Sequence, residues 1–175
     1  MKRFHLILAA SLCLFVSATA QEEKPQPVIL NLGDSITKGV RGGVTAGQTF
    51  SAILEKRLSV PILNVGIGGE RTDQALQRLE KAVIGQRPRI VPIMYGTNDS
   101  YIDTGKKGSR ITKIAYEENL RSLIEKLLLE GIEPVLMTEP RWASNKENWK
   151  GESPNRCSEF LSKSAARSPN LRTCS

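Results

Sequence analysis

Histidine is almost absent from this 175-residue sequence, because the single one is His5. No imidazole group is therefore available as a proton carrier anywhere after residue 5. Long apolar runs are also missing beyond the N-terminal segment, whereas a helix needs roughly 20 apolar residues to span a bilayer. This second absence excludes a membrane-spanning helix in the rest of the sequence.

The first twenty residues have the pattern of an export signal. Two basic residues at 2–3 precede an apolar core at 6–16, and the small residues 18–20 lie before a polar segment at 21–27. The apolar core is shorter than a membrane span. We therefore expect residues 1–20 to be a signal peptide and 21–27 a polar linker, which predicts a secreted or periplasmic protein without stable membrane insertion.

Cysteine is scarce, with three residues in the chain. Cys13 is a weak candidate for lipid attachment because Leu12, rather than a small residue, precedes it. Only Cys157 and Cys174 follow the predicted signal, and whether they form a disulfide stays open.

The positive charge is concentrated at the end of the chain. The formal net charge is +7, and removing Lys2 and Arg3 with the signal leaves +5. Residues 141–175 form a basic, serine-rich tail with seven basic and three acidic residues. A surplus confined to a polar tail is more often solvated charge than a docking surface, so we expect no nucleic-acid partner.

Apolar runs of strand length alternate with helical patterns in the remaining domain-sized segment. The runs lie at 28–32, 61–65, 90–95 and 134–138. They are continuous rather than alternating, as in buried parallel strands. Between them, apolar residues recur with helical spacing. This alternation predicts a three-layer, flavodoxin-like α/β domain over 28–140, with a parallel sheet in the order 2-1-3-4 and helices on both faces.

Three short polar segments each follow one of these apolar runs. They are Gly33-Asp34-Ser35, Asn64-Val-Gly-Ile-Gly-Gly69 and Gly96-Thr-Asn98-Asp99. Each segment alone is most simply a turn. A dinucleotide loop is excluded for the second, since Arg71 stands at the third glycine position. Together, at the carboxyl ends of parallel strands, the three segments are expected to converge on one site.

The residue types in these segments suit an ester-hydrolysing site. Ser35 would lie near the amino end of a helical turn, where free N–H groups favour negative charge. Gly69 has no side chain, so its N–H can approach a substrate oxygen closely. Asn98 offers a side-chain amide as a further donor, and one such donor is worth about 3 to 4 kcal/mol in the barrier.

On these motifs, the chain resembles the SGNH hydrolases, the GDSL esterase and lipase family, over residues 28–140. The resemblance implies that Ser35 is the nucleophile, and that its N–H, Gly69 and Asn98 form an oxyanion hole. Gly33, Asp34, Gly96 and Asp99 would support these residues. The implied substrate is a small ester or an acetylated carbohydrate, and no cofactor or metal is expected.

The family's Asp-x-x-His block has no counterpart in this sequence. The remaining candidates for a base are Asp34, Asp99, Asp103 and Glu139, for which structural roles such as bonding loop amides are expected. The domain therefore looks incomplete at its C-terminal end, with the fourth strand as an unprotected edge. Two explanations stay open: a truncated or frame-shifted chain with a non-native tail, and a short pseudoenzyme that retains ligand binding without catalysis.

Overall fold

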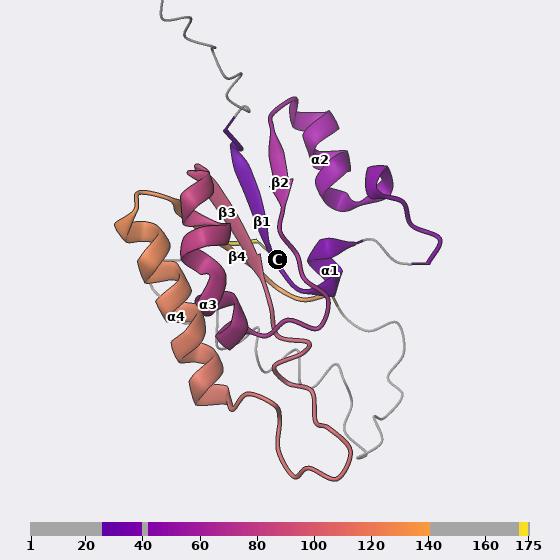
Figure 1. The fold of residues 1–175 in the computed structure, drawn as a ribbon, viewed down its shortest axis with the longest axis vertical. Helices are drawn as coiled ribbons and strands as arrows, with labels where there is room; N and C mark the ends of the chain where they lie inside the picture. Colours follow the sequence, from indigo (N-terminus) through magenta and orange to yellow (C-terminus); the bar gives the residue numbers. More distant parts are fainter. Residues whose placement is uncertain (1–25, 40–41, 141–171, 175) are drawn as a thin grey trace, which may run out of the picture.

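A computed structural model describes residues 26–39, 42–140 and 172–174 of the chain. Its parallel strands form one sheet in the order β2-β1-β3-β4-β5 (Figure 1). They are β1 (Ile29–Gly33), β2 (Ile62–Asn64), β3 (Ile90–Met94), β4 (Glu133–Met137) and β5 (Arg172–Cys174). The helices are α1 (Ser35–Lys38), η1 (Ala46–Gln48), α2 (Phe50–Leu58), α3 (Thr72–Ala82), η2 (Ile84–Gln86) and α4 (Lys113–Leu129).

The order of the first four strands confirms the predicted arrangement 2-1-3-4. β1 lies between β2 and β3 and is parallel to both. The connection after β1 leads to β2 on one side, and the connection after β2 leads to β3 on the other side. The strand order therefore reverses at β1. Ligand sites of open α/β sheets form at such a switch point.

The prediction that β4 is the unprotected edge of the sheet is wrong. β5 pairs with β4 in parallel, with Leu136 opposite Thr173. Ladder hydrogen bonds come from the backbone, so a polar segment can supply them. A strand of only three residues does not produce an apolar run that sequence patterning would detect.

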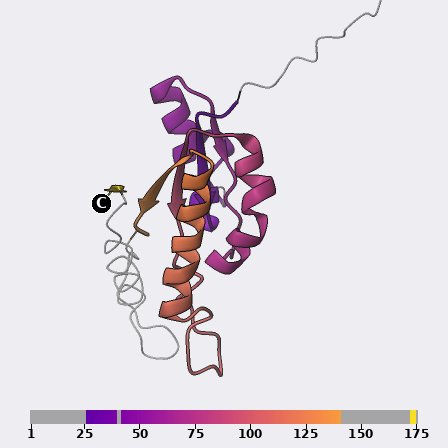
Figure 2. The same cartoon turned by 90° about the vertical axis from the view of Figure 1, so that its left-hand side faces the viewer.

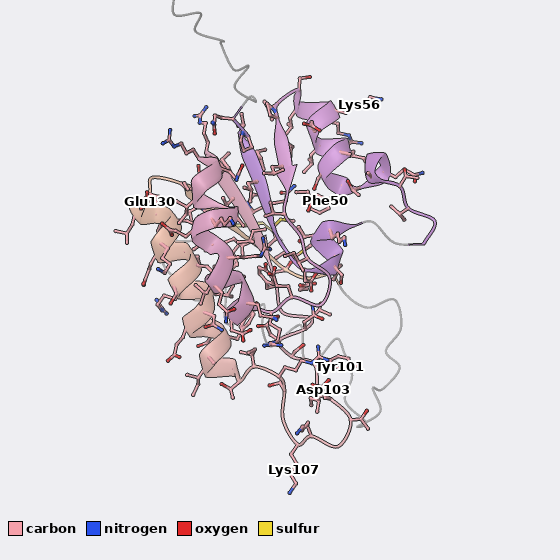
Figure 3. The ribbon with its side chains drawn as sticks, in the orientation of Figure 1. Phe50, Lys56, Tyr101, Asp103, Lys107 and Glu130 are labelled. Carbon is pink, nitrogen blue, oxygen red and sulfur yellow. The ribbon has the colours of Figure 1, made fainter. Side chains whose placement is uncertain are left out.

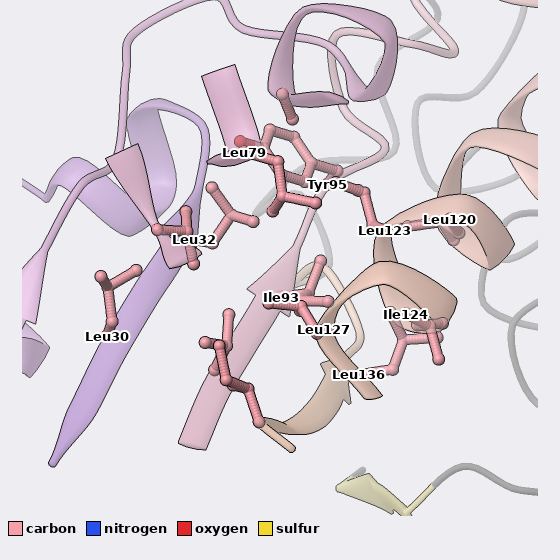
Figure 4. Packing of buried hydrophobic residues seen from close by; sticks show 14 of the residues in the cluster. Leu30, Leu32, Leu79, Ile93, Tyr95, Leu120, Leu123, Ile124, Leu127 and Leu136 are labelled. Carbon is pink, nitrogen blue, oxygen red and sulfur yellow. The ribbon is translucent and has the colours of Figure 1, made fainter. Parts of the chain in front are cut away.

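The apolar core lies between one face of the sheet and the helices α3 and α4 (Figures 1 and 4). Leu30 and Leu32 of β1 are fully buried on this face, since alternate residues of a strand share a side. They join Leu79 from α3 and Leu123 from α4 in one cluster. The apolar residues that recur with helical spacing in the sequence are thus the ones that α3 and α4 pack against the sheet. Figure 2 shows the layers from the side.

A polar network lies on the opposite face of β1, where α2 packs. Asn31 Nδ2 donates to Ser51 Oγ of α2 at 2.8 Å. Asn64 Nδ2 donates to the same oxygen at 2.8 Å and to the carbonyl of Thr37 at 2.7 Å. The network joins α1, α2, β1 and β2, and so fixes the short helix that begins at Ser35.

The predicted signal peptide, most of the basic tail and Cys157 lie outside the described residues. No helix within the described ranges is long and apolar enough to cross a membrane.

Candidate active site

Ser35 occupies the first position of α1, directly after β1. The side chain of Asp34 caps this helix, because its Oδ1 accepts a hydrogen bond from the Ile36 amide at 2.8 Å. Gly33 makes the tight approach between β1 and α1 feasible. A Cβ at this position would lie 2.0 Å from Thr37 Oγ1 and 2.5 Å from the Met94 carbonyl oxygen. Ser35 is exposed, while Asp34 beneath it is fully buried.

The second segment passes close to the helix that carries Ser35. A Cβ on Gly66 would lie 2.3 Å from the Lys38 amide nitrogen, so only glycine fits there without a shift. A Cβ on Gly68 would lie 4.0 Å from Ser35 Cβ. Gly69 has a positive φ of 77° and open space beside its Cα, which leaves its surroundings accessible to a ligand.

The third segment brings Asn98 to the same edge of the sheet. Its Nδ2 donates to Asp34 Oδ2 at 2.8 Å and to the Glu70 carbonyl oxygen at 3.1 Å. The structure therefore gathers Ser35, Gly69 and Asn98 at the carboxyl ends of neighbouring strands. Both Asn98 N–H groups have acceptors within the protein, which the sequence did not predict.

A buried charged cluster supports this edge of the sheet, and no motif in the sequence indicates it. The Glu70 carboxylate accepts two bonds from the Arg78 guanidinium, each of 2.6 Å, and one from Tyr95 Oη of 2.5 Å. Arg78 Nη2 also donates to the Val65 carbonyl at 2.8 Å. Glu70 and Arg78 stand eight positions apart in the sequence, and no motif indicates that they pair, because a contact between a loop and a helix has no fixed spacing.

Three carboxyl groups of this region have raised pKa values: Asp34 and Asp99, which are buried, and Glu139, which is half-buried. Burial raises the pKa of Asp34, and the charges of Asp99 and Glu70 add to this effect. Burial also raises the pKa of Asp99, against hydrogen bonds from Thr72. For Glu139, burial and the charge of Asp34 raise the pKa from 4.5 to about 7.

Hydrogen bonds give the candidate bases structural roles. Asp99 Oδ1 accepts from the Thr72 amide at 3.0 Å and holds the start of α3. Glu139 Oε2 accepts from Thr97 Oγ1 at 2.9 Å, which links β4 to the segment that carries Asn98. Within residues 26–39 and 42–140, Asp99 Oδ2 and Glu139 Oε1 are buried without a hydrogen-bond partner.

The loop after Asn98 projects beyond the sheet and has its own internal contacts. Arg110 makes two hydrogen bonds to Asp103, of 2.9 and 2.6 Å, and lies 4.6 Å from the centre of the Tyr101 ring. These bonds lower the pKa of Asp103, which makes it a weak base. Figure 3 shows Tyr101 and Asp103 in this loop and Lys107 at its far end.

The part of the chain that the structure describes contains no histidine, because the single histidine of the sequence is His5. Among the described residues, no group of three or more His, Cys, Asp or Glu side chains is arranged to hold a metal ion.

The fold and the site define a class of proteins: parallel α/β domains with a serine at the start of the first helix and glycine and asparagine segments beside it. The chain belongs to the GDSL-like lipase/acylhydrolase family, whose model matches residues 32–168. This confirms the family resemblance and the α/β fold that the motifs predicted.

Known relatives agree with this assignment. The uncharacterized lipoprotein YqeF of Bacillus subtilis is 37% identical over 143 residues, which cover 79% of this chain and 57% of YqeF. The acetylxylan esterase of Geobacillus stearothermophilus is 32% identical over 129 residues, which cover 63% of this chain and 58% of the esterase. The chain thus spans less than two thirds of the length of these curated relatives.

Solved structures show the same fold. A lipase/acylhydrolase from Enterococcus faecalis superimposes with a TM-score of 0.65 at 29% identity, covering 84% of this chain and 74% of that chain.

Proposed function

We propose that this chain carries the nucleophile and oxyanion-stabilising part of an exported serine ester hydrolase. The observation that supports the proposal is the convergence of Ser35, Gly69 and Asn98 at one edge of the sheet. Ser35 is exposed at a helix start, where backbone N–H groups favour negative charge. Gly33, Asp34, Gly96 and Asp99 shape the turns around it.

The proposed reaction is acyl transfer through Ser35. Its Oγ forms a bond to the acyl carbon, and the carbonyl oxygen becomes an oxyanion that faces the N–H groups of Ser35 and Gly69 and the amide of Asn98. The bond to the alcohol then breaks, and the alcohol leaves with a proton. Water hydrolyses the acyl-serine, which releases the acid and restores the hydroxyl group. Ser35 needs a base to give up its proton, and no imidazole is available in this sequence.

A small ester or an acetylated carbohydrate is the proposed substrate class. The name of the Geobacillus stearothermophilus relative, an acetylxylan esterase, supports the acetyl group as the part that is transferred. Export to the cell exterior or the periplasm would bring the chain to such material, because polymer fragments are available there.

The second candidate function is ligand binding without catalysis, in a remnant or pseudoenzyme of the same fold. Two observations favour it: the single histidine is His5, and the Asn98 amide already has two acceptors inside the protein. A pocket can persist when the proton acceptor is absent.

Hydrolysis of 4-nitrophenyl acetate separates the two candidates. Because no imidazole can act as the base in this sequence, we expect negligible turnover that changes little in Ser35→Ala, with Ser122→Ala on α4 as the matched control, and this result would favour the second candidate. A serine-hydrolase site that lacks a triad member still retains roughly 10³ to 10⁴ over water, so a trace rate agrees with this expectation. Rapid turnover that Ser35→Ala abolishes, with organophosphate labelling of Ser35, would contradict it and show that another group acts as the base.

Binding of methylboronic acid tests the nucleophile directly. Ser35 Oγ adds to the trigonal boron, the hydroxyl proton passes to solvent, and a tetrahedral anion forms that resembles the acyl-transfer intermediate. We expect an adduct signal in ¹¹B NMR for the wild type and for Ser122→Ala, and none for Ser35→Ala. Absence of the signal from the wild type would overturn the proposed role of Ser35.

A further inference from the structure

Glu70 contacts both of the segments that supply the outer oxyanion donors. It follows Gly69 directly, and its own carbonyl oxygen accepts the Asn98 amide. We propose that Glu70 is a positioning residue that sets the spacing between the Gly69 and Asn98 donors. The inference rests on the proposed function and adds a residue that the motifs did not indicate.

The carboxylate of Glu70 is anchored on two elements of the core. Arg78 reaches it from α3 through Nε and Nη2, and Tyr95 reaches it from the end of β3 through Oη. Glu70 is 5% exposed and the Arg78 side chain 19%, so these bonds lie largely out of water. Charge-assisted, two-point bonds of this kind fix orientation as well as distance.

The backbone of Glu70 closes the turn that contains Gly69. The Glu70 amide donates to the Ile67 carbonyl at 3.3 Å, and the Ile67 amide donates to the Gly33 carbonyl at 3.0 Å. The turn is thus tied at one end to the strand that precedes Ser35 and at the other end to the Arg78 cluster. Gly69 between them has a left-handed φ that few other residues adopt, so the direction of its N–H depends on both anchors.

The carbonyl of Glu70 holds one N–H of Asn98 in the resting protein. This bond is 3.1 Å long and joins neutral groups, whereas the bond from Asn98 to Asp34 is 2.8 Å long. Bonds to an ionised acceptor are the stronger ones. An oxyanion would therefore displace the Glu70 carbonyl, while Asp34 keeps the amide in place. Glu70 in this way orients the donor before the charge develops.

A purely stabilising role explains the cluster poorly. A buried ion pair costs desolvation of both charges, and apolar residues of similar volume are often as stable in its place. Removal of one partner alone is costly because the other is left buried and unpaired. These two effects allow positioning to be separated from stability by comparing single and double variants.

The experiment measures methylboronic acid affinity by ¹¹B NMR together with the melting temperature of the full chain. Tyr95→Phe removes one bond to Glu70 and keeps the packing, so we expect a small loss of affinity. Glu70→Gln is expected to weaken binding by roughly tenfold to a hundredfold, less than the 10² to 10³ lost with an oxyanion donor. Glu70→Gln with Arg78→Met should regain melting temperature without regaining affinity.

Leu127→Ala is the matched control, because it removes a fully buried apolar side chain near the end of α4 and none of the hydrogen bonds that hold Glu70. It should lower the melting temperature and keep the boronic acid affinity within about twofold of the wild type, since the oxyanion donors are unchanged. The inference is overturned if Glu70→Gln and the double variant bind boronic acid as the wild type does. A wild type that forms no adduct overturns the proposed function and this inference with it, whereas intact wild-type binding with unaffected variants overturns the inference alone.

Discussion

Glu139 combines features that a solvent-facing glutamate does not have. It lies two residues after β4, accepts a bond from Thr97 and is buried at Oε1 without a partner among the described residues. Burial, with the charge of Asp34, raises its pKa from 4.5 to about 7. The folded protein therefore binds more protons than the unfolded chain between these two values, and its stability falls as the pH rises through this range.

We predict that Glu139→Gln removes this pH dependence. Glu139 should lower the free energy of unfolding of the wild type between pH 4.5 and pH 7 by at most about 3.5 kcal/mol, since one pKa unit corresponds to roughly 1.4 kcal/mol. The variant should match the wild type near pH 5 and exceed it near pH 8. Urea unfolding at a series of pH values measures both curves.

Glu125→Gln on the exposed side of α4 is the control and should follow the wild-type curve. Parallel curves for Glu139→Gln and the wild type would show that Glu139 does not change its ionisation on folding.

Local motifs identify residues but not their partners. Ser35, Gly69 and Asn98 could be singled out because each stands in a short segment after an apolar run. The bond between Thr97 and Glu139 spans 42 residues, and the bond between Asn98 and Asp34 spans 64. Such contacts depend on the strand order, so no local motif indicates that the Asn98 amide already has acceptors.

Among the elements, long periodic segments were predictable and the shortest one was not. The buried strands β1 and β3 and the helix α4 have clear apolar patterns, and their order followed from the chirality of the connections. β5 has three residues and is held by backbone bonds to β4. A pattern based on side chains cannot detect it.

We predict that deleting residues 172–175 promotes association of the chain. The deletion removes β5 and leaves the outer N–H and C=O groups of β4 unpaired, and such edges pair with other chains. Sedimentation velocity at increasing protein concentration should show larger species for the deletion variant than for the full chain.

Deletion of Ser175 alone keeps β5 and should leave the sedimentation of the full chain unchanged. Equal, concentration-independent sedimentation of both deletion variants would mean that β5 does not protect the edge of β4.

At the scale of the whole molecule, the expected export signal and the family domain occupy different parts of the sequence. The family match covers 32–168, and residues 1–20 lie before it with the composition of an export signal. Two routes of signal removal would give different products. Cleavage after Ala20 gives a chain that begins at Gln21, whereas lipid attachment gives a lipid-bearing chain that begins at Cys13.

We predict that the exported product begins at Gln21 and carries no lipid. The small residues Ala18 and Ala20 fit the cleavage site of a secretory signal, whereas Leu12 before Cys13 does not fit a lipid-attachment site. Intact mass and N-terminal sequencing of the protein recovered from a bacterial periplasm or culture medium measure this. Ala20→Asp should block processing, because a charged residue replaces the small one at the cleavage position, and Cys13→Ala should leave the product unchanged. A lipid-modified product that disappears in Cys13→Ala, or unprocessed wild-type chain in the cytoplasm, would contradict the prediction.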